Sequence, residues 1–163
     1  MKNIKSKKGF GLIEMIVGVA IVSIGIVGTF SMISRFSYQS QVIRDSFIAS
    51  NLAQEGIEIV KNIRDTNALE DANWNDGLTH CQSGCEMDYT NDSLLSWSGD
   101  GRYLYLNNNG GYTYNSAGAI ETYYKRRITI TEVEPNKSME IIVSVYWESS
   151  QTTLVSKIYN WWQ

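Results

Sequence analysis

The stretch KKGFGLIEMIVGVAIVSIGIVG, from Lys7 to Gly28, decides how this chain is organised. It opens with lysines and turns apolar at Phe10, and from Phe10 to Ile33 the single charged side chain is Glu14. A bilayer core about 30 Å thick requires about 20 helical residues. The apolar run is therefore long enough to span a membrane, and no later run in the sequence is.

The charges around the run predict its orientation. The leader, residues 1–9, is charged only through lysines, and Arg35 follows the run. Positive residues favour the cytoplasmic side, so we expect residues 1–9 in the cytoplasm and the rest beyond the membrane. A cleaved secretory signal would have a shorter apolar core, about 7–15 residues, followed by a small-residue cleavage site. The sequence has neither feature, which favours a single-pass membrane anchor.

The net charge makes nucleic acid an unlikely partner. The chain of 163 residues has 14 basic and 17 acidic side chains, a formal charge of -3, and losing the four leader lysines makes it more acidic. General nucleic-acid binding needs a basic face. One local basic patch, Lys125–Arg127, stays open as an alternative.

After the apolar run, residues 35–65 show the periodicity of an amphipathic helix. Ile48, Leu52, Ile59 and Ile63 form one stripe, flanked by Phe47 and Val60. Polar residues are assigned to the other side: Asp45, Asn51, Glu55, Glu58, Lys61 and Asn62. The first proline is Pro135, so we expect one helix that continues from residue 10 to about 63.

The remaining sequence, residues 66–163, predicts a globular β domain. Residues 66–120 are rich in turn-forming Asn, Asp, Gly and Ser. The runs YKRRITITEVE, SMEIIVSVYWE and TTLVSKIYNWW then alternate with period two, and EPNKS and ESSQT read as the turns between them. The expected fold class is α+β, with a long N-terminal helix packed on a C-terminal antiparallel sheet and an irregular region between them.

Glu14 has two interpretations. A carboxylate near the membrane interface is tolerated more easily than one at the centre, so its position alone could be incidental. In the second interpretation, cleavage between Gly9 and Phe10 exposes an α-amine with a pKa near 8 at Phe10. The amine of a neighbouring subunit could then neutralise Glu14 within the apolar zone, where an unpaired charge is costly.

These residues resemble the N-terminus of a type IV prepilin or pseudopilin. That family has a short basic leader, Gly at the cleavage site, Phe as the new first residue and Glu four residues later, as at Gly9, Phe10 and Glu14 here. The resemblance implies cleavage by a prepilin peptidase, N-methylation of Phe10, and assembly with other pilin or pseudopilin subunits at an inner-membrane platform. It implies a leader at 1–9, a transmembrane and filament-core half at 10–34, and a cell-surface filament.

The stretch NLAQEGIEIVKNIRD and the closing runs YKRRITI, IIVSVYW and IYNWW resemble minor pilins of the PilV type, also called type IV pilus modification proteins. The same stretches also resemble the I-type minor pseudopilin of type II secretion, and the sequence does not separate the two. Major pilins usually carry a helix-distorting proline where this chain has Ser31, and often close a C-terminal disulfide loop. These departures favour a minor subunit. The alternative from another class is a membrane-anchored adhesin or DNA-uptake module that does not polymerise.

Glycines recur along the apolar run at Gly11, Gly18, Gly25 and Gly28. The first three are seven residues apart and Gly28 is one turn further, which places all four along one side of a helix, and small residues let membrane helices approach closely. We therefore predict that this strip packs against other helices. The alternative is that glycine is simply commoner in membrane helices.

Other candidate chemistry is weak. Cys81 and Cys85, next to His80, suit a small structural disulfide on the exported side, with two free thiols as the alternative. A zinc site is less well supported, because it needs about four ligands. The segment starting at Asp71 partly matches a calcium-binding loop. It has Asp76 where that loop has glycine and Gln82 where it has glutamate, so a turn that holds Trp74 against the sheet is the simpler interpretation. We expect no metal, no cofactor and no enzymatic activity.

The many aromatic residues are expected mostly in the core, with Trp147 and one of Trp161 and Trp162 facing inward.

Overall fold

The computed structural model describes residues 11–91 and 93–161. Contacts within the chain divide it into two compact units, with the boundary between Arg44 and Asp45. Helix α1, Leu12–Leu69, begins in the first unit and ends in the second. As predicted, no break interrupts it. Every described residue of the first unit is exposed, whereas the buried residues of α1 all lie from Asp45 onward.

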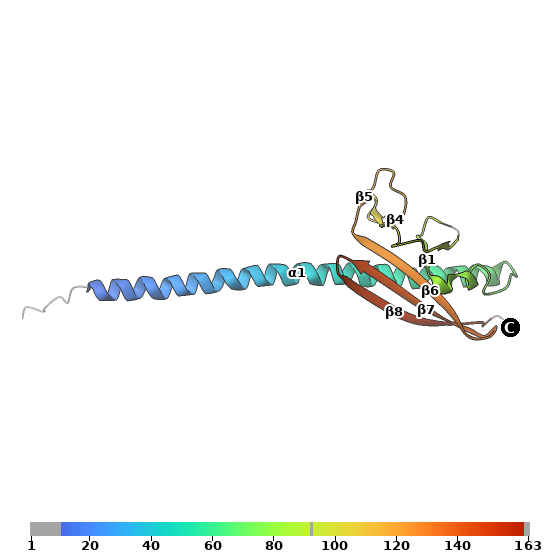
Figure 1. Ribbon diagram of the computed structural model, residues 1–163, viewed down its shortest axis with the longest axis horizontal. Helices are drawn as coiled ribbons and strands as arrows, with labels where there is room; N and C mark the ends of the chain where they lie inside the picture. Colours follow the sequence, from blue (N-terminus) through green and yellow to red (C-terminus); the bar gives the residue numbers. More distant parts are fainter. Residues whose placement is uncertain (1–10, 92, 162–163) are drawn as a thin grey trace, which may run out of the picture. The chain divides into compact units, whose positions relative to one another are not determined.

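The second unit is built on an antiparallel meander of three long strands. These are β6, Tyr124–Glu134, β7, Ser138–Trp147, and β8, Ser150–Tyr159. Figure 1 shows them as long neighbouring arrows. The sheet order is β2-β1-β6-β7-β8. The β6–β7 turn lies where the sequence predicted it, whereas β8 begins at Ser150, inside the predicted ESSQT turn. Asn136 and Glu148 adopt positive φ in the two turns.

One face of this sheet packs on α1, which confirms the predicted α+β, pilin-like fold. The predicted alternation of β7 is also confirmed, because Ile141, Val143, Val145 and Trp147 are all buried. From α1, Ala49, Leu52, Ala53 and Val60 complete the same core. Small residues on the helix allow the close approach: a Cβ at Gly56 would lie 2.8 Å from Val143 Cγ1.

Residues 70–123 form short elements that the sequence did not resolve. The 3₁₀ helix η1, Thr79–Ser83, precedes β1, Cys85–Glu86, and β2, Leu95–Ser96, which join the main sheet. A second sheet has the order β4-β3-β5, from Tyr112–Thr113, Tyr105–Leu106 and Ile120–Glu121.

Hydrogen bonds to Asp88 connect these loops. Its carboxylate is buried and accepts hydrogen bonds from the Thr90 amide and hydroxyl, the Thr113 hydroxyl and the Tyr114 amide, among others. Burial opposes its ionisation, but these hydrogen bonds outweigh that effect and hold the pKa of Asp88 below its ordinary value of 3.8. The β4 strand is thereby fixed to the loop after β1.

The predicted turn around Trp74 is confirmed. Trp74 is 5% exposed, belongs to the core, and donates from Nε1 to Asn136 Oδ1 in the β6–β7 turn at 3.0 Å. The Asn67 side-chain amide donates to the carbonyls of Trp74 and Asp76. The turn is thus anchored to both the end of α1 and the sheet.

Several sequence-based placements of side chains were wrong. Asp45, assigned to the polar face, is 5% exposed, because the Tyr123 and Tyr124 hydroxyls donate to its Oδ1 at 2.9 and 3.3 Å. Phe47, assigned beside the apolar stripe, is 67% exposed. The burial of Trp147, by contrast, is confirmed. Trp161 is 57% exposed and Trp162 lies outside the described residues, so the expectation that one of this pair faces inward stays a prediction.

The basic patch at Lys125–Arg127 does not form as one surface. Alternation along β6 turns Arg126 inward, where it is fully buried. Its guanidinium donates to the carbonyls of Leu52 and Met87, and its Nη1 lies 3.3 Å from Glu55 Oε2. This buried cation fastens α1 to the sheet and to the loop after β1.

Candidate functional site: the N-terminal segment

The helix begins with a local hydrogen-bonded cap. The Gly11 carbonyl accepts bonds from the amides of Glu14 and Met15 at 3.0 and 3.3 Å. In return, the Gly11 amide donates to Glu14 Oε2 at 2.9 Å. A glutamate in the first turn that reaches back to the cap amide satisfies a donor the helix leaves unpaired, and its negative charge suits the positive end of the helix dipole.

The two predicted processing residues, Gly9 and Phe10, lie outside the described residues. The structure places the predicted assembly residue, Glu14, in the first turn of α1, three residues from the start of the described chain. Its assembly role therefore stays a prediction. Sequence reasoning missed its bond to Gly11, although the signal was present: an acid three residues after a glycine that opens an apolar run.

The first unit has an exposed apolar surface. Large apolar side chains from Leu12 to Phe36 are at least half exposed, among them Leu12, Ile24 and Phe30. By length and composition, α1 contains one segment able to cross a membrane. A surface this apolar is unsuited to water and must be covered by lipid or protein.

The hydroxyls in this segment suit the same environment. Ser23, Thr29 and Ser34 each donate to the carbonyl four residues earlier, at 2.8, 2.8 and 3.1 Å. These three hydroxyls are thus satisfied within the helix, as an apolar surrounding demands.

Among residues 11–91 and 93–161, the predicted glycine strip has no packing partner. A Cβ at Gly18, Gly25 or Gly28 would meet no atom within 4 Å. A Cβ at Gly11 would meet only Glu14 Oε2, at 3.5 Å. Packing of the strip against other helices stays a prediction.

Residues 4–30 carry the prokaryotic N-terminal methylation motif. The match covers a minority of the chain's 163 residues, those with the basic leader, Glu14 and the first turns of α1. It supports a type IV pilin-like or pseudopilin subunit, with the processing by prepilin peptidase and the assembly with other pilins that this motif implies. Together with the apolar helix, it supports membrane anchoring. No curated protein and no solved structure matches the chain significantly.

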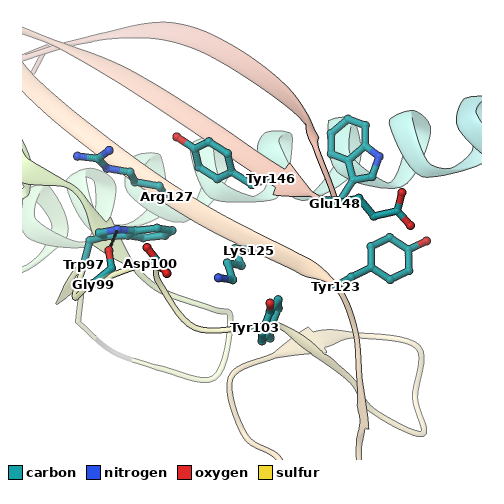
Figure 2. Close-up of a pocket in the computed structure, with 10 residues that line it drawn as sticks. Trp97, Gly99, Asp100, Tyr103, Tyr123, Lys125, Arg127, Tyr146 and Glu148 are labelled. Atoms are coloured by element: carbon teal, nitrogen blue, oxygen red, sulfur yellow. Dashed lines mark hydrogen bonds between the residues drawn. The ribbon is translucent and has the colours of Figure 1, made fainter.

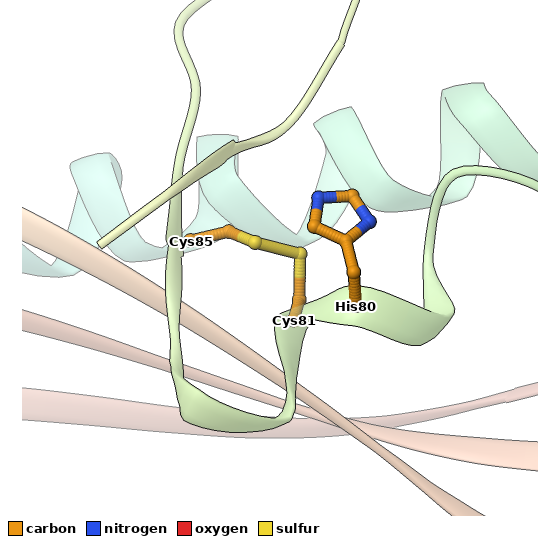
Figure 3. A group of neighbouring side chains, drawn as sticks. All are labelled: His80, Cys81 and Cys85. Carbon is orange, nitrogen blue, oxygen red and sulfur yellow. A yellow bond between two sulfur atoms is a disulfide. The ribbon is translucent and has the colours of Figure 1, made fainter. Parts of the chain in front are cut away.

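In the second unit of this pilin-like chain, Cys81 and Cys85 are joined by a disulfide, with 5.2 Å between their Cα atoms (Figure 3). With His80 they form the one group of possible His, Cys, Asp and Glu metal ligands among the described residues. The disulfide occupies both sulfur atoms, so the group offers no thiolate. The Nε2 of His80 lies 3.1 Å from the Leu94 carbonyl and is engaged with the backbone.

Proposed function

We propose that this chain is a minor pilin or pseudopilin, a non-enzymatic structural subunit of a type IV pilus-like filament. The methylation motif at residues 4–30 carries the proposal, because it runs directly into a helix whose apolar surface is exposed. Cleavage between Gly9 and Phe10 removes residues 1–9, and Phe10 is then methylated. Residues 10–34 leave the cytoplasmic membrane for the filament core, and residues 35–65 and 66–163 remain outside.

Glu14 directs assembly in this proposal. A carboxylate has two oxygens and about four acceptor positions. The bond from the Gly11 amide uses one position on Oε2, which leaves room for the Phe10 ammonium of a neighbouring subunit. Pairing offsets the cost of an acid in an apolar surrounding, so it favours the assembled helices over separate ones. The strip Gly11, Gly18, Gly25 and Gly28 lets those helices approach closely.

Two features favour a minor subunit. The chain has Ser31 in place of the proline of major pilins, and its disulfide closes a loop in the middle of the chain, between Cys81 and Cys85. A minor pseudopilin of type II secretion is the alternative within the family. Recovery of the chain with pilus subunits or with secretion-system subunits after cross-linking distinguishes them. A non-polymerising adhesin or DNA-uptake module would be recovered with neither.

Processing provides the test. In cells with a prepilin peptidase, Gly9→Leu should leave the leader attached and give a band about 1 kDa heavier than the mature chain (nine residues at roughly 110 Da each). Gly25→Ala is the matched control, because Gly25 lies outside the cleavage site and a Cβ there contacts nothing. Equal processing of the Gly9→Leu variant and the control would refute cleavage at this position.

A further inference from the structure

A cleft lies on the sheet face that points away from α1, between the loop at residues 97–103 and strands β6 and β7 (Figure 2). Lys125 and Arg127 reach this face because the intervening Arg126 points into the core. The cleft encloses about 470 Å³. Aromatic and charged side chains from three segments line it, including Trp97, Tyr103, Tyr123, Lys125, Tyr146 and Glu148.

The disulfide loop holds one wall of the cleft in place. The carbonyl of Ser83, within the loop, accepts a bond from Arg127 Nη2 at 2.7 Å. The carbonyl of Gly84 accepts one from the Trp97 amide at 3.0 Å. The Trp97 ring also donates from Nε1 to the Gly99 carbonyl at 3.0 Å, and the backbone of Gly101 lies so close to the ring that a Cβ there would clash at 2.2 Å. This wall is therefore preformed, which lowers the entropic cost of binding.

Aromatic faces and cations meet at the centre of the cleft. Lys125 Nζ lies 4.4 Å from the centre of the Tyr103 ring, and Arg127 Cζ lies 5.7 Å from the centre of the Trp97 ring. Tyr103 is 42% exposed, so part of its side chain is open to a ligand. Tyr146, which pairs with Lys125 across the strands, contacts Trp97 with 6.3 Å between ring centres.

The charges of the cleft indicate the chemistry of its ligand. Lys125 and Arg127 are balanced by Asp100 and Glu148, which are exposed at its edges. The carboxylates accept hydrogen bonds from hydroxyls, the ammonium donates to them, and the aromatic faces suit an apolar ring surface. A polyanion fits less well, because both carboxylates would repel it. The unit as a whole is also acidic, with 8 basic and 16 acidic side chains from residue 45 onward.

We propose that this cleft binds an uncharged saccharide, with a sugar ring on Tyr103 and its hydroxyls on Lys125, Asp100 and Glu148. The inference stands on the second unit alone and does not rest on the proposed assembly of the chain. The proposal also accounts for the disulfide. Cys81 and Cys85 close a loop, and hydrogen bonds to this loop hold both Arg127 and Trp97 in position.

Binding to an array of uncharged oligosaccharides tests the proposal, using the full chain in detergent. Sulfated glycosaminoglycan and single-stranded oligothymidylate are included as anionic probes. We expect binding to one or more uncharged oligosaccharides, and a loss of at least tenfold in affinity for Tyr103→Ala and for Lys125→Met. Both side chains are partly exposed at the surface, so both variants should keep the wild-type unfolding temperature.

The chain offers a matched control outside the cleft. Lys157 Nζ lies 5.2 Å from the centre of the Tyr159 ring on β8, and Tyr159 is 53% exposed. Tyr159→Ala and Lys157→Met should bind like the wild type. The proposal is overturned if no uncharged oligosaccharide binds, if only the anionic probes bind, or if the cleft variants and the control variants bind alike.

Discussion

Gly56 of α1 lies directly against Val143 of β7, and a Cβ at Gly56 would come within 2.8 Å of Val143 Cγ1 and 3.2 Å of Arg126 Cδ. Both neighbours are fully buried, so neither moves at low cost. The helix and the sheet are this close because the helix has no side chain at that point. A glycine in a helix interior costs about 0.5–1 kcal/mol relative to alanine, which the close packing must offset.

Gly56→Ala should therefore destabilise the second unit in spite of alanine's better helix propensity. Overpacking of this kind costs about 1–3 kcal/mol, which corresponds to a fall of several degrees in unfolding temperature. Thermal unfolding followed by tryptophan fluorescence measures it. Gly25→Ala, where a Cβ meets nothing within 4 Å, should leave the unfolding temperature unchanged. Equal unfolding temperatures for the two variants would contradict the close contact.

The buried guanidinium of Arg126 should be among the most sensitive positions in the chain. Arg126→Met removes the donor to the Leu52 and Met87 carbonyls and the partner of Glu55. Breaking a buried pair of this kind costs about 3–5 kcal/mol. Lys61→Met, which breaks an exposed pair with Glu58, should cost less than about 1 kcal/mol. Urea unfolding of both variants compares them, and similar losses would show that Arg126 has no special role.

Stability should fall in acid partly through Asp88. Its folded-state pKa lies below 3.8, so its ionisation stabilises the folded chain above that value, and the contribution is lost as the pH falls through the folded pKa. Asp88→Asn should destabilise the chain by about 1–3 kcal/mol at pH 7, because an amide nitrogen cannot accept the bonds from Thr113 and Tyr114.

Unfolding temperatures measured from pH 7 down to pH 3 follow this effect. The difference in unfolding temperature between the wild type and Asp88→Asn should become smaller as the pH falls. Asp100→Asn, an exposed carboxylate, is the control and should stay close to the wild type throughout. A gap that stays constant with pH would show that the charge on Asp88 does not contribute.

Glu14→Gln separates the two roles of Glu14. The glutamine carbonyl can still accept the bond from the Gly11 amide, so the helix cap survives, but the negative charge is gone. If Glu14 pairs with the amine of a neighbour, both Glu14→Gln and Glu14→Ala should be cleaved normally and be strongly depleted from sheared filaments. Immunoblots of filament and membrane fractions measure this. If the Glu14→Gln variant were incorporated into filaments normally, the charge of Glu14 would have no role in assembly and the residue would act only as a helix cap.

The fold could be predicted where one physical rule dominates. Strand β6 coincides with the run YKRRITITEVE because its period-two alternation and the Pro-Asn turn after it mark where the strand lies. The burial of Asp45 and Arg126 could not be predicted, since their partners are distant in sequence. Tyr123 and Tyr124 lie 78 and 79 residues from Asp45, and the Leu52 and Met87 carbonyls lie 74 and 39 residues from Arg126. Charged residues are rarely buried without such partners, so the pattern alone favours the surface.

The same distinction applies to the two candidate sites, of which one could be predicted from the sequence and the other could not. The motif around Gly9, Phe10 and Glu14 is contiguous, so it could be read directly from the sequence. The cleft could not, because the 97–103 loop and two strands line it and the disulfide loop supports one wall, and only the folded chain brings these segments together. The basic triplet that suggested a patch instead places Lys125 and Arg127 in this cleft and Arg126 in the core.

The most direct test of the account is the mass of the N-terminal peptide of this chain, isolated from cells that express it with a prepilin peptidase. The account predicts a peptide that begins at Phe10 and carries one methyl group on its α-amine. A peptide that begins at Met1 and retains Lys2, Lys5, Lys7 and Lys8 would contradict it.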